Sequence, residues 1–290
     1  SVLMNKGPSR ISPFLIPMTI ANMAPGLLAI RFNFRGTNFT LSTACASATN
    51  AIGEATRLIR AGILDIAMTG GSEATVTPLA LAGFSNMNAL SRGTPKTASR
   101  PFDRDRDGFV MAEGSATLII EEYEHAMKRG AMIYGEVVGY GSTDDAFHIT
   151  SPEESGDGAY RAMKMALEEA GVDPSEVDYI NAHGTSTPLN DLMETRAIKR
   201  LFGNRQDLHI SSTKSMAGHA LGAAGAIEAV ATLLSMKNSF IPPTINYSSP
   251  DPECDLNYTP NFGVEKELHF VQKNSFGFGG HNASLLFKKL

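Results

Sequence analysis

The sequence predicts an α/β fold in one compact unit, with mostly parallel strands. Apolar runs of strand length alternate with segments of helical period along the 290-residue chain. Hydrophobic residues make up 42% and charged residues 19%, which is enough apolar surface for a sizeable core. No short tandem repeat, low-complexity tract or Gly/Ser linker divides the sequence. We therefore expect no domains on a flexible tether.

Composition and targeting signals narrow the class of protein. The formal charge of −5 argues against binding to nucleic acid or to an anionic membrane. Two cysteines cannot build a disulfide framework, and they indicate a reducing compartment. Residues 11–30 carry no formal charge, but Pro13, Pro17 and Pro25 interrupt them, so we expect buried loop and short helix there. Neither a secretory signal nor a lipidation motif is recognisable, and we expect a soluble, cytoplasmic protein.

The first half of the chain predicts a strand, a tight turn and then a helix. Residues 39–44 (FTLSTA) have strand-like composition. Residues 48–61 follow with apolar side chains spaced four, three and four apart, the pattern of one helix face. The turn between them contains Cys45.

The second half repeats this alternation. A helix is predicted over 159–170, closed by Gly171, and a second helix over 218–237. Its predicted strands cover residues 177–182, 208–213, 268–274 and 283–288. The last two strands are joined by a Gly-rich turn at 275–282 (SFGFGGHN).

Cys45 is a candidate nucleophile because small residues surround it between a predicted strand end and a helix start. The positive end of the helix dipole and nearby backbone N–H groups would favour a thiolate there and lower its pKa. A buried structural cysteine is the alternative. Cys254 follows no predicted strand and has two neighbouring carboxylates, so we expect it to be inert.

Two histidines lie at the end of a predicted strand or the start of a predicted helix, positions that often face a ligand in α/β proteins. His183 follows a predicted strand and opens the segment HGTSTP, although a hydrogen-bonded structural histidine is the alternative. His219 precedes a helix rich in Ala and Gly, and a helix N-terminus favours a neutral imidazole whose N–H can donate to a developing negative charge. The remaining histidines are predicted to be surface or packing residues: His125, His148, His209 and His269.

Other glycine-rich or acidic segments are weaker signals. The turn at 276–280 can place backbone N–H groups against a ligand or can form a plain hairpin. Phosphate-binding signatures for ATP or NAD are absent from the sequence. Residues 103–108 match the opening of a calcium-binding loop, but Gly114 occupies its twelfth position, so we expect a structural turn with carboxylate–Arg pairs. No metal-ligand motif such as H-E-x-x-H occurs.

The order of these residues resembles the elongating β-ketoacyl-acyl-carrier-protein synthases, especially synthase II. The similarity runs through essentially the whole chain. The matching segments are TACASA at 43–48, RPFDRDRDGFVMAEG at 100–114, NAHGTST at 181–187, TKSMAGHALGAAGAIEA at 213–229, PPTINY at 242–247 and NSFGFGGHN at 274–282.

The resemblance implies a thiolase-like α/β fold, with two related halves in five alternating layers (αβαβα). Residues 1–134 would be the remainder of the first half and carry the nucleophile. Residues 135–290 would form the second half, with both histidines and the Gly-rich turn. Family members normally begin well over a hundred residues before the active-site Cys, so the first half is expected to be incomplete. The alternative is a truncated, catalytically silent fragment.

The resemblance also implies a decarboxylative Claisen condensation with malonyl-acyl carrier protein. Cys45 would accept the acyl chain, while His183 and His219 would assist loss of CO₂ and stabilise the enolate. Backbone N–H groups of Cys45 and Phe278 would form the oxyanion hole. By position, Lys214 and Glu228 would form a supporting ion pair, and the hydroxyl groups of Thr185 and Thr187 would lie near the phosphopantetheine arm. Asp191 would place a carboxylate at the edge of the site. Phe84 and Phe276 would line the substrate pocket.

Several further properties are implied by the same resemblance. We expect acyl carrier protein and acyl and malonyl thioesters as partners, a homodimer, and no nucleic acid, membrane insertion, metal or resident cofactor. Phosphopantetheine would arrive on the carrier protein. Organelle matrix or stroma is the alternative location, and a polyketide-type ketosynthase is the alternative enzyme. Ala112 and His281 depart from the usual family residues, without an expected loss of chemistry.

Overall fold

The computed structural model describes residues 2–94 and 96–290. The chain forms two compact units, Ser1–Leu41 and Ser42–Leu290, which are treated separately below. Within the described residues, no helix combines the length and the apolar character needed to cross a membrane.

The first unit consists of short helices. They are α1 (Val2–Lys6), the 3₁₀ turn η1 (Pro8–Arg10), α2 (Leu15–Thr19) and α3 (Met23–Phe32). The short helix predicted within residues 11–30 is therefore confirmed, but the predicted burial is wrong. None of the side chains described in residues 2–41 is buried, and Ile30 is 77% exposed, because helices this short do not cover one another's apolar faces.

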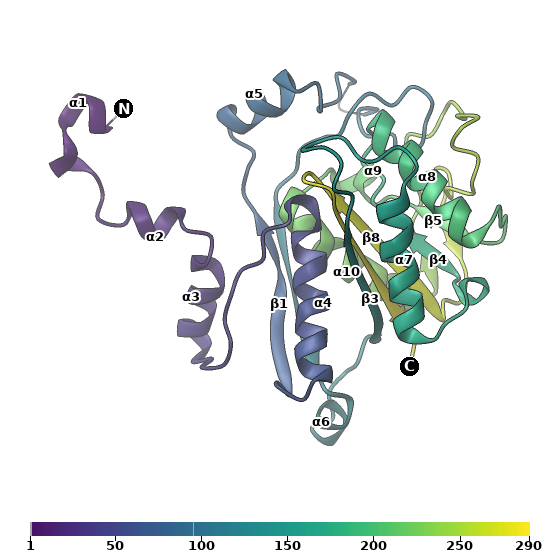
Figure 1. Ribbon diagram of the computed structural model, residues 1–290, viewed down its shortest axis with the longest axis horizontal. Helices are drawn as coiled ribbons and strands as arrows, with labels where there is room; N and C mark the ends of the chain where they lie inside the picture. The colour runs from purple at the N-terminus through teal and green to yellow at the C-terminus, as the bar shows by residue number, and fades with distance from the viewer. Residues whose placement is uncertain (1, 95) are drawn as a thin grey trace. The chain divides into compact units, whose positions relative to one another are not determined.

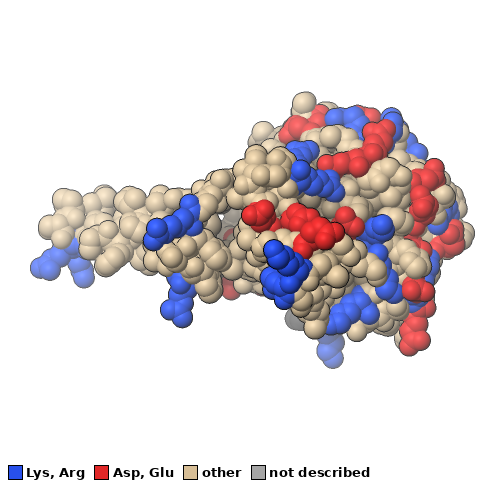
Figure 2. All heavy atoms as spheres, turned by 90° about the horizontal axis from the view of Figure 1, so that it is seen from below, with Lys and Arg blue, Asp and Glu red and all other residues tan. Residues whose placement is uncertain are grey.

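Charge is distributed differently in the two units. Residues 1–41 contain basic residues and no Asp or Glu. In Figure 2 the second unit instead shows blue and red side chains interspersed over the visible face. Mixed signs of this kind give no broad basic surface of the sort that binds nucleic acid.

The second unit contains the remaining elements (Figure 1). Its helices are α4 (Ser47–Arg60), α5 (Pro78–Asn86), α6 (Tyr123–Lys128), α7 (Asp157–Ala170), α8 (Pro188–Phe202), α9 (Lys214–Ala217) and α10 (Leu221–Asn238), with 3₁₀ turns η2 (Ala44–Ala46) and η3 (Pro174–Glu176). Its strands are β1 (Ile66–Glu73), β2 (Gly114–Glu121), β3 (Glu136–Asp144), β4 (Tyr179–Asn181), β5 (His209–Ser211), β6 (Phe240–Ile241), β7 (Val264–Glu265), β8 (Phe270–Gly277) and β9 (His281–Lys288).

The main sheet has five strands in the order β3-β9-β8-β4-β5. β4 is parallel to both β5 and β8, whereas β8 pairs antiparallel with β9 and β9 pairs antiparallel with β3. β1 and β2 form a separate antiparallel pair. The prediction of mostly parallel strands is therefore wrong. The tight turn between β8 and β9 forces an antiparallel hairpin at the centre of the sheet.

Alternating layers build two cores. One core lies where α7 and α8 pack on the main sheet and includes Met163, Ile180 and Ile198. The second joins the other face of this sheet to α4 and α10, and it includes Ile52 and Leu285. α4 and α10 also pack on β1, so the layers run α7/α8, main sheet, α4/α10 and the β1–β2 pair (Figure 1). The predicted α/β layering is confirmed, and the described residues supply four of its five layers.

Most predicted elements occur close to their predicted bounds. The helices predicted at 48–61, 159–170 and 218–237 correspond to α4, α7 and α10, and Gly171 closes α7 with a φ of 65°. The strands predicted in the second half correspond to β4, β5, β8 and β9. The strand predicted over 39–44 is wrong, because within the described chain residues 39–43 pair with no strand and lead directly into η2. The division into two halves at residue 134 stays a prediction.

Glycines on β3 let α7 pack directly against the backbone of the sheet. A Cβ on Gly141 would overlap the carbonyl oxygen of Ala162, and one on Gly139 would overlap that of Ala166. Both carbonyl groups belong to α7. This contact fixes the helix on the face of the sheet and allows no added methyl group.

We predict that Gly141→Ala destabilises the protein by about 1–3 kcal/mol, because α7 must move away from β3. The matched control is Gly83→Ala, since a Cβ at this α5 position meets nothing within 4 Å. The control is expected to be neutral or to stabilise slightly. Urea denaturation followed by circular dichroism measures both changes. Equal stability of Gly141→Ala and the wild type would show that α7 does not pack as described.

Candidate active site

Cys45 lies in η2, immediately before α4. Ala44 adopts the left-handed conformation with a φ of 49°, and Ser47 Oγ accepts a hydrogen bond from the Thr43 N–H at 2.8 Å. These features turn the chain sharply and direct the thiol away from the helix axis. The predicted tight turn ahead of a helix is confirmed, although an unpaired segment rather than a strand leads into it.

His183 and His219 come from two loops that meet near this turn. His183 follows β4, and its backbone N–H donates to Glu194 Oε1 at 2.9 Å. His219 lies between α9 and α10, and its N–H donates to the Val110 carbonyl at 2.7 Å. The Ala112 N–H in turn donates to the His219 carbonyl at 3.0 Å. Segment 110–112 therefore fixes the backbone of His219 through two hydrogen bonds, like those between neighbouring strands.

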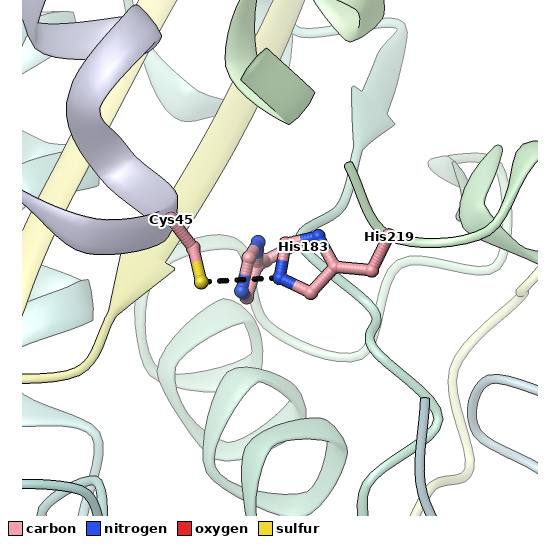
Figure 3. A group of neighbouring side chains, drawn as sticks. All are labelled: Cys45, His183 and His219. Carbon is pink, nitrogen blue, oxygen red and sulfur yellow. Dashed lines mark hydrogen bonds between the residues drawn. The ribbon is translucent and has the colours of Figure 1, made fainter. Parts of the chain in front are cut away.

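The thiol and both imidazoles converge (Figure 3). His219 Nε2 lies 3.1 Å from Cys45 Sγ, the interaction drawn as a dashed line. The two imidazole rings meet edge to face, with centroids 5.3 Å apart. The sulfur and one nitrogen of each ring all lie within 4.8 Å of one another. The predicted convergence of Cys45, His183 and His219 is confirmed.

Lys214 determines how the His183 ring can act. Its buried ammonium donates to the His183 carbonyl at 2.6 Å, contacts His183 Nδ1 at 3.3 Å and pairs with Glu228. An ammonium only donates, so Nδ1 accepts and the proton of the neutral ring is on Nε2. Nε2 is then the nitrogen that can donate to a bound ligand. The predicted ion pair between Lys214 and Glu228 is confirmed.

Both imidazoles are held neutral. Burial and the nearby Lys214 charge place the pKa of His183 well below its usual value. The pKa of His219 is lowered in the same way, by burial first and then by the charges of Lys214 and Lys273. The predicted neutral ring at 219 is confirmed, with burial rather than the helix end as the main cause.

The predicted lowering of the Cys45 pKa is wrong. Burial raises the pKa of this thiol to about 11, against smaller opposing effects from Lys214 and the backbone N–H of Cys45 itself. Desolvation of the anion therefore outweighs the local positive charge. The resting sulfur is protonated and can give its proton to His219 Nε2. Burial also raises the pKa of Cys254 to about 11, the same value as for Cys45. The predicted inertness of Cys254 therefore stays a prediction.

Aromatic side chains cover the two imidazoles. Phe276 meets His183 edge to face at 5.7 Å between centroids, and Phe109 meets His219 in the same manner at 5.3 Å. Phe84, on α5, contacts Phe109 at 5.4 Å. The predicted pocket aromatics Phe84 and Phe276 therefore lie near the site. Phe109 was missed, although it is the first apolar residue after the acidic segment 103–107.

The Gly-rich turn lies against the nucleophile. A Cβ on Gly277 would approach the Thr43 carbonyl oxygen and the Cys45 backbone nitrogen within 3.0 Å, so glycine permits this approach. Phe278 follows directly and is partly buried. The turn therefore lies beside the backbone of Cys45, and the predicted oxyanion hole of Cys45 and Phe278 stays a prediction.

Thr185 and Thr187 lie on the loop that follows His183, and their hydroxyl groups are hydrogen-bonded to each other at 2.8 Å. Asp191 belongs to a different network. It is fully buried on α8, accepts the Phe102 N–H at 2.8 Å and lies 3.8 Å from Arg106. These contacts support the turn at 100–106, and the predicted place of Asp191 at the edge of the site stays a prediction.

The acidic segment is a structural turn, as predicted. Asp103 accepts backbone N–H groups of Ser248 and Ser249 at 2.7 Å each. Arg106 contacts Asp251 at 2.5 Å. The carboxylates are thus engaged in holding the loop that leads into segment 110–112, where His219 is anchored.

Glu194 is a further residue that sequence reasoning missed. It is fully buried on α8 and accepts the backbone N–H groups of His183 and Gly184 at 2.9 and 2.8 Å. Burial raises its pKa to about 7. An acidic residue among the apolar residues Met193, Ala197 and Ile198 was the available signal.

The thiol and the imidazoles are side chains of the kinds that bind Zn²⁺. The charge of Lys214, which contacts His183, opposes binding of a divalent cation there. The expectation that the site uses no metal and no resident cofactor stays an expectation.

Comparisons with known proteins agree with this geometry. Residues 1–126 match the family model described as Beta-ketoacyl synthase, N-terminal domain, and residues 134–248 match Beta-ketoacyl synthase, C-terminal domain. The chain is 56% identical over 292 residues to the 3-oxoacyl-[acyl-carrier-protein] synthase 2 of Synechocystis sp.. That match covers 100% of this chain and 70% of the relative.

Solved structures show the same fold. A type II polyketide ketosynthase in complex with its acyl-carrier protein superimposes with a TM-score of 0.96 at 40% identity, covering 100% of this chain and 74% of that one. A beta-ketoacyl synthase from Burkholderia phymatum gives 0.94 at 38% identity, covering 100% and 71%. Fold, site and both family models agree, and the chain belongs to the beta-ketoacyl synthase family with its thiolase-like fold.

Proposed function

We propose that this protein extends an acyl chain by two carbons in fatty-acid synthesis. The reaction is a decarboxylative Claisen condensation with malonyl-acyl carrier protein that gives 3-oxoacyl-acyl carrier protein. The convergence of Cys45, His183 and His219 within 4.8 Å carries this proposal. The curated name of the Synechocystis relative supports the fatty-acid substrate class.

The first step transfers the acyl chain to Cys45. As sulfur bonds to the thioester carbonyl carbon, the Cys45 proton passes to His219 Nε2 at 3.1 Å. The negative charge on the carbonyl oxygen is stabilised by the backbone N–H groups of Cys45 and Phe278. The bond to the phosphopantetheine sulfur then breaks, and His219 returns the proton to that leaving thiolate. The product is an acyl-Cys45 thioester and a neutral imidazole.

The second step forms the enolate and the new carbon–carbon bond. The carboxylate of the malonyl group leaves as CO₂, and its bonding electrons pass into an enolate. Its oxygen accepts the Nε2–H of His183, whose tautomer Lys214 determines. His219 can add a second donor only as the Nε2–H tautomer, which becomes available once Cys45 is a thioester and no longer donates to that nitrogen. The enolate carbon attacks the acyl-Cys45 carbonyl and the Cys45 thiolate leaves. The thiolate then takes up one proton from water, which is the proton that the overall reaction consumes.

The substrate and partner residues are proposals as well. The hydroxyl groups of Thr185 and Thr187 would contact the phosphopantetheine arm, and Phe84 would line the acyl pocket. Acyl carrier protein is the proposed partner, because a structural neighbour is a ketosynthase solved in complex with an acyl-carrier protein. A homodimer is proposed too, supported by the exposed apolar side chains of the first unit. A cytoplasmic location is part of the same proposal.

A polyketide-type ketosynthase is the second candidate, because the 40% identical structural neighbour is one. Its chemistry at the thiol and imidazoles would be the same. The 56% identical relative named 3-oxoacyl-acyl-carrier-protein synthase 2 favours fatty-acid elongation. Product analysis with saturated acyl thioesters and with poly-β-keto thioesters separates the two.

We predict that Cys45→Ala abolishes formation of the acyl-enzyme. Intact-mass spectrometry after incubation with acyl-carrier thioester should show one acyl adduct on the wild type and none on the variant. The control Cys254→Ser removes the second, buried cysteine and should keep the adduct. An adduct that persists in folded Cys45→Ala would refute the assignment of the nucleophile.

We predict that His183→Ala separates the two steps. Acylation of Cys45 should proceed, because its proton acceptor His219 is unchanged. Condensation should fall roughly 10²–10³-fold, the loss expected for one oxyanion-type donor. Adduct mass and the release of CO₂ from malonyl-acyl carrier protein measure the steps separately. The exposed His269→Ala is the control, and an equal loss in both steps of His183→Ala would contradict the proposed division of roles.

A further inference from the structure

Lys273 is a fully buried cation that the mechanism above does not use. It lies on β8 within a polar run, Gln272 to Ser275, of which every side chain is buried. Its ammonium lies 3.0 Å from Glu228 Oε2, donates to Thr49 Oγ1 at 2.8 Å and donates to Ser275 Oγ. The buried ammonium therefore donates to two hydroxyl groups and faces one carboxylate at ion-pair distance, although among the described residues Glu228 Oε2 accepts no hydrogen bond.

The three partners of the ammonium belong to elements next to the reacting groups. Thr49 lies on α4, which begins just after Cys45, and Ser275 lies on the strand that ends at the Gly-rich turn. Glu228 lies on α10, which follows His219. Lys273 therefore links three elements that adjoin Cys45, the Gly-rich turn and His219.

Glu228 is shared between two lysines. Lys214 pairs with Oε1, while Lys273 approaches Oε2. One carboxylate thus faces two ammonium groups, and these three side chains carry a net positive charge when both lysines are protonated. Glu194, whose pKa burial raises to about 7, offsets part of that charge when it is ionised. This charge opposes protonation of nearby imidazoles and favours negative charge on a substrate. Lys273 is among the causes that lower the pKa of His183 and of His219.

We propose that Lys273 is a positioning residue of the condensation site, bracing Glu228 opposite Lys214 and keeping the surroundings of both imidazoles positive. This role of Lys273 rests on the proposed condensation. The electrostatic effect of Lys273 on the two imidazoles, however, can be measured in the absence of turnover. Burial lowers the pKa of Lys273 to about 8, so the group is mainly charged at neutral pH. The titratable and charged groups that face it are Glu228 on α10, Lys214 on α9, Glu194 on α8, and His183 and His219 on their loops.

The test measures the imidazole pKa values of His183 and His219 by NMR titration of the 290-residue chain, with resonances assigned from the His183→Ala and His219→Ala variants. Lys273→Met keeps the length of the side chain and removes its charge. Both imidazole pKa values should rise by roughly half a pH unit or more, because a neighbouring positive charge is lost. Lys273→Arg should leave them nearly unchanged. Lys288→Met, an exposed lysine on β9, is the matched control and should show no change.

A second variant covers the case in which Lys273→Met does not fold. Ser275→Ala removes one acceptor of the ammonium, which favours the neutral lysine, and should move both imidazole pKa values upward by less. Unchanged pKa values in whichever of these variants folds would overturn the proposal, since a residue that only fills space would not alter them. Condensation assays then separate the two proposals. If the wild type forms no acyl-Cys45, the proposed function fails, whereas unmoved pKa values in an active enzyme refute only the role of Lys273.

Discussion

A buried cation, the ammonium of Lys214, determines the chemistry of this site. It is paired with Glu228 and bonded to the His183 carbonyl, and it contacts Nδ1 of the same ring. These contacts fix the tautomer of His183 and disfavour its protonation. A neutral imidazole with its N–H on Nε2 is the donor that an enolate oxygen needs. Removing Glu228 would leave a buried charge unpaired, which typically costs 3–5 kcal/mol, so the pair also constrains which sequences fold.

The fold brings these groups together because the ends of strands and the starts of helices that carry them lie next to one another. Cys45 precedes α4, His183 follows β4, His219 precedes α10, and the Gly-rich turn joins β8 to β9. α4 and α10 pack side by side between the main sheet and the β1–β2 pair. Glycines at 141 and 277 allow the close contacts that this arrangement needs. Burial follows from the same packing, and it raises the pKa of the thiol while lowering those of the imidazoles.

Sequence reasoning predicted the elements whose periodicity is local. Apolar spacing placed α4, α7 and α10, and composition placed β4 and the β8–β9 hairpin. The resemblance to β-ketoacyl synthases, carried by the ordered motifs around Cys45, His183 and His219, predicted the site, because a family likeness carries tertiary information that periodicity lacks. The predictions of a strand at 39–44 and of burial for residues 11–30 were wrong. Strand pairing and burial both depend on tertiary contacts, which a local sequence pattern does not reveal. Lys273, Glu194 and Phe109 were missed for a related reason. Lys273 and Phe109 have contacts distant in sequence, Glu194 contacts the loop just before its own helix, and each looks like an ordinary member of its own segment.

The most direct test of this account is a crystal structure of the protein with Cys45 alkylated by iodoacetamide. The carbonyl oxygen of the adduct should accept the backbone N–H groups of Cys45 and Phe278, with both imidazoles facing the adduct. Lys214 should remain in contact with Glu228 and with His183 Nδ1. An adduct oxygen turned to solvent, or a His183 ring detached from Lys214, would contradict the claim that one dry, positively charged site holds all three reacting side chains.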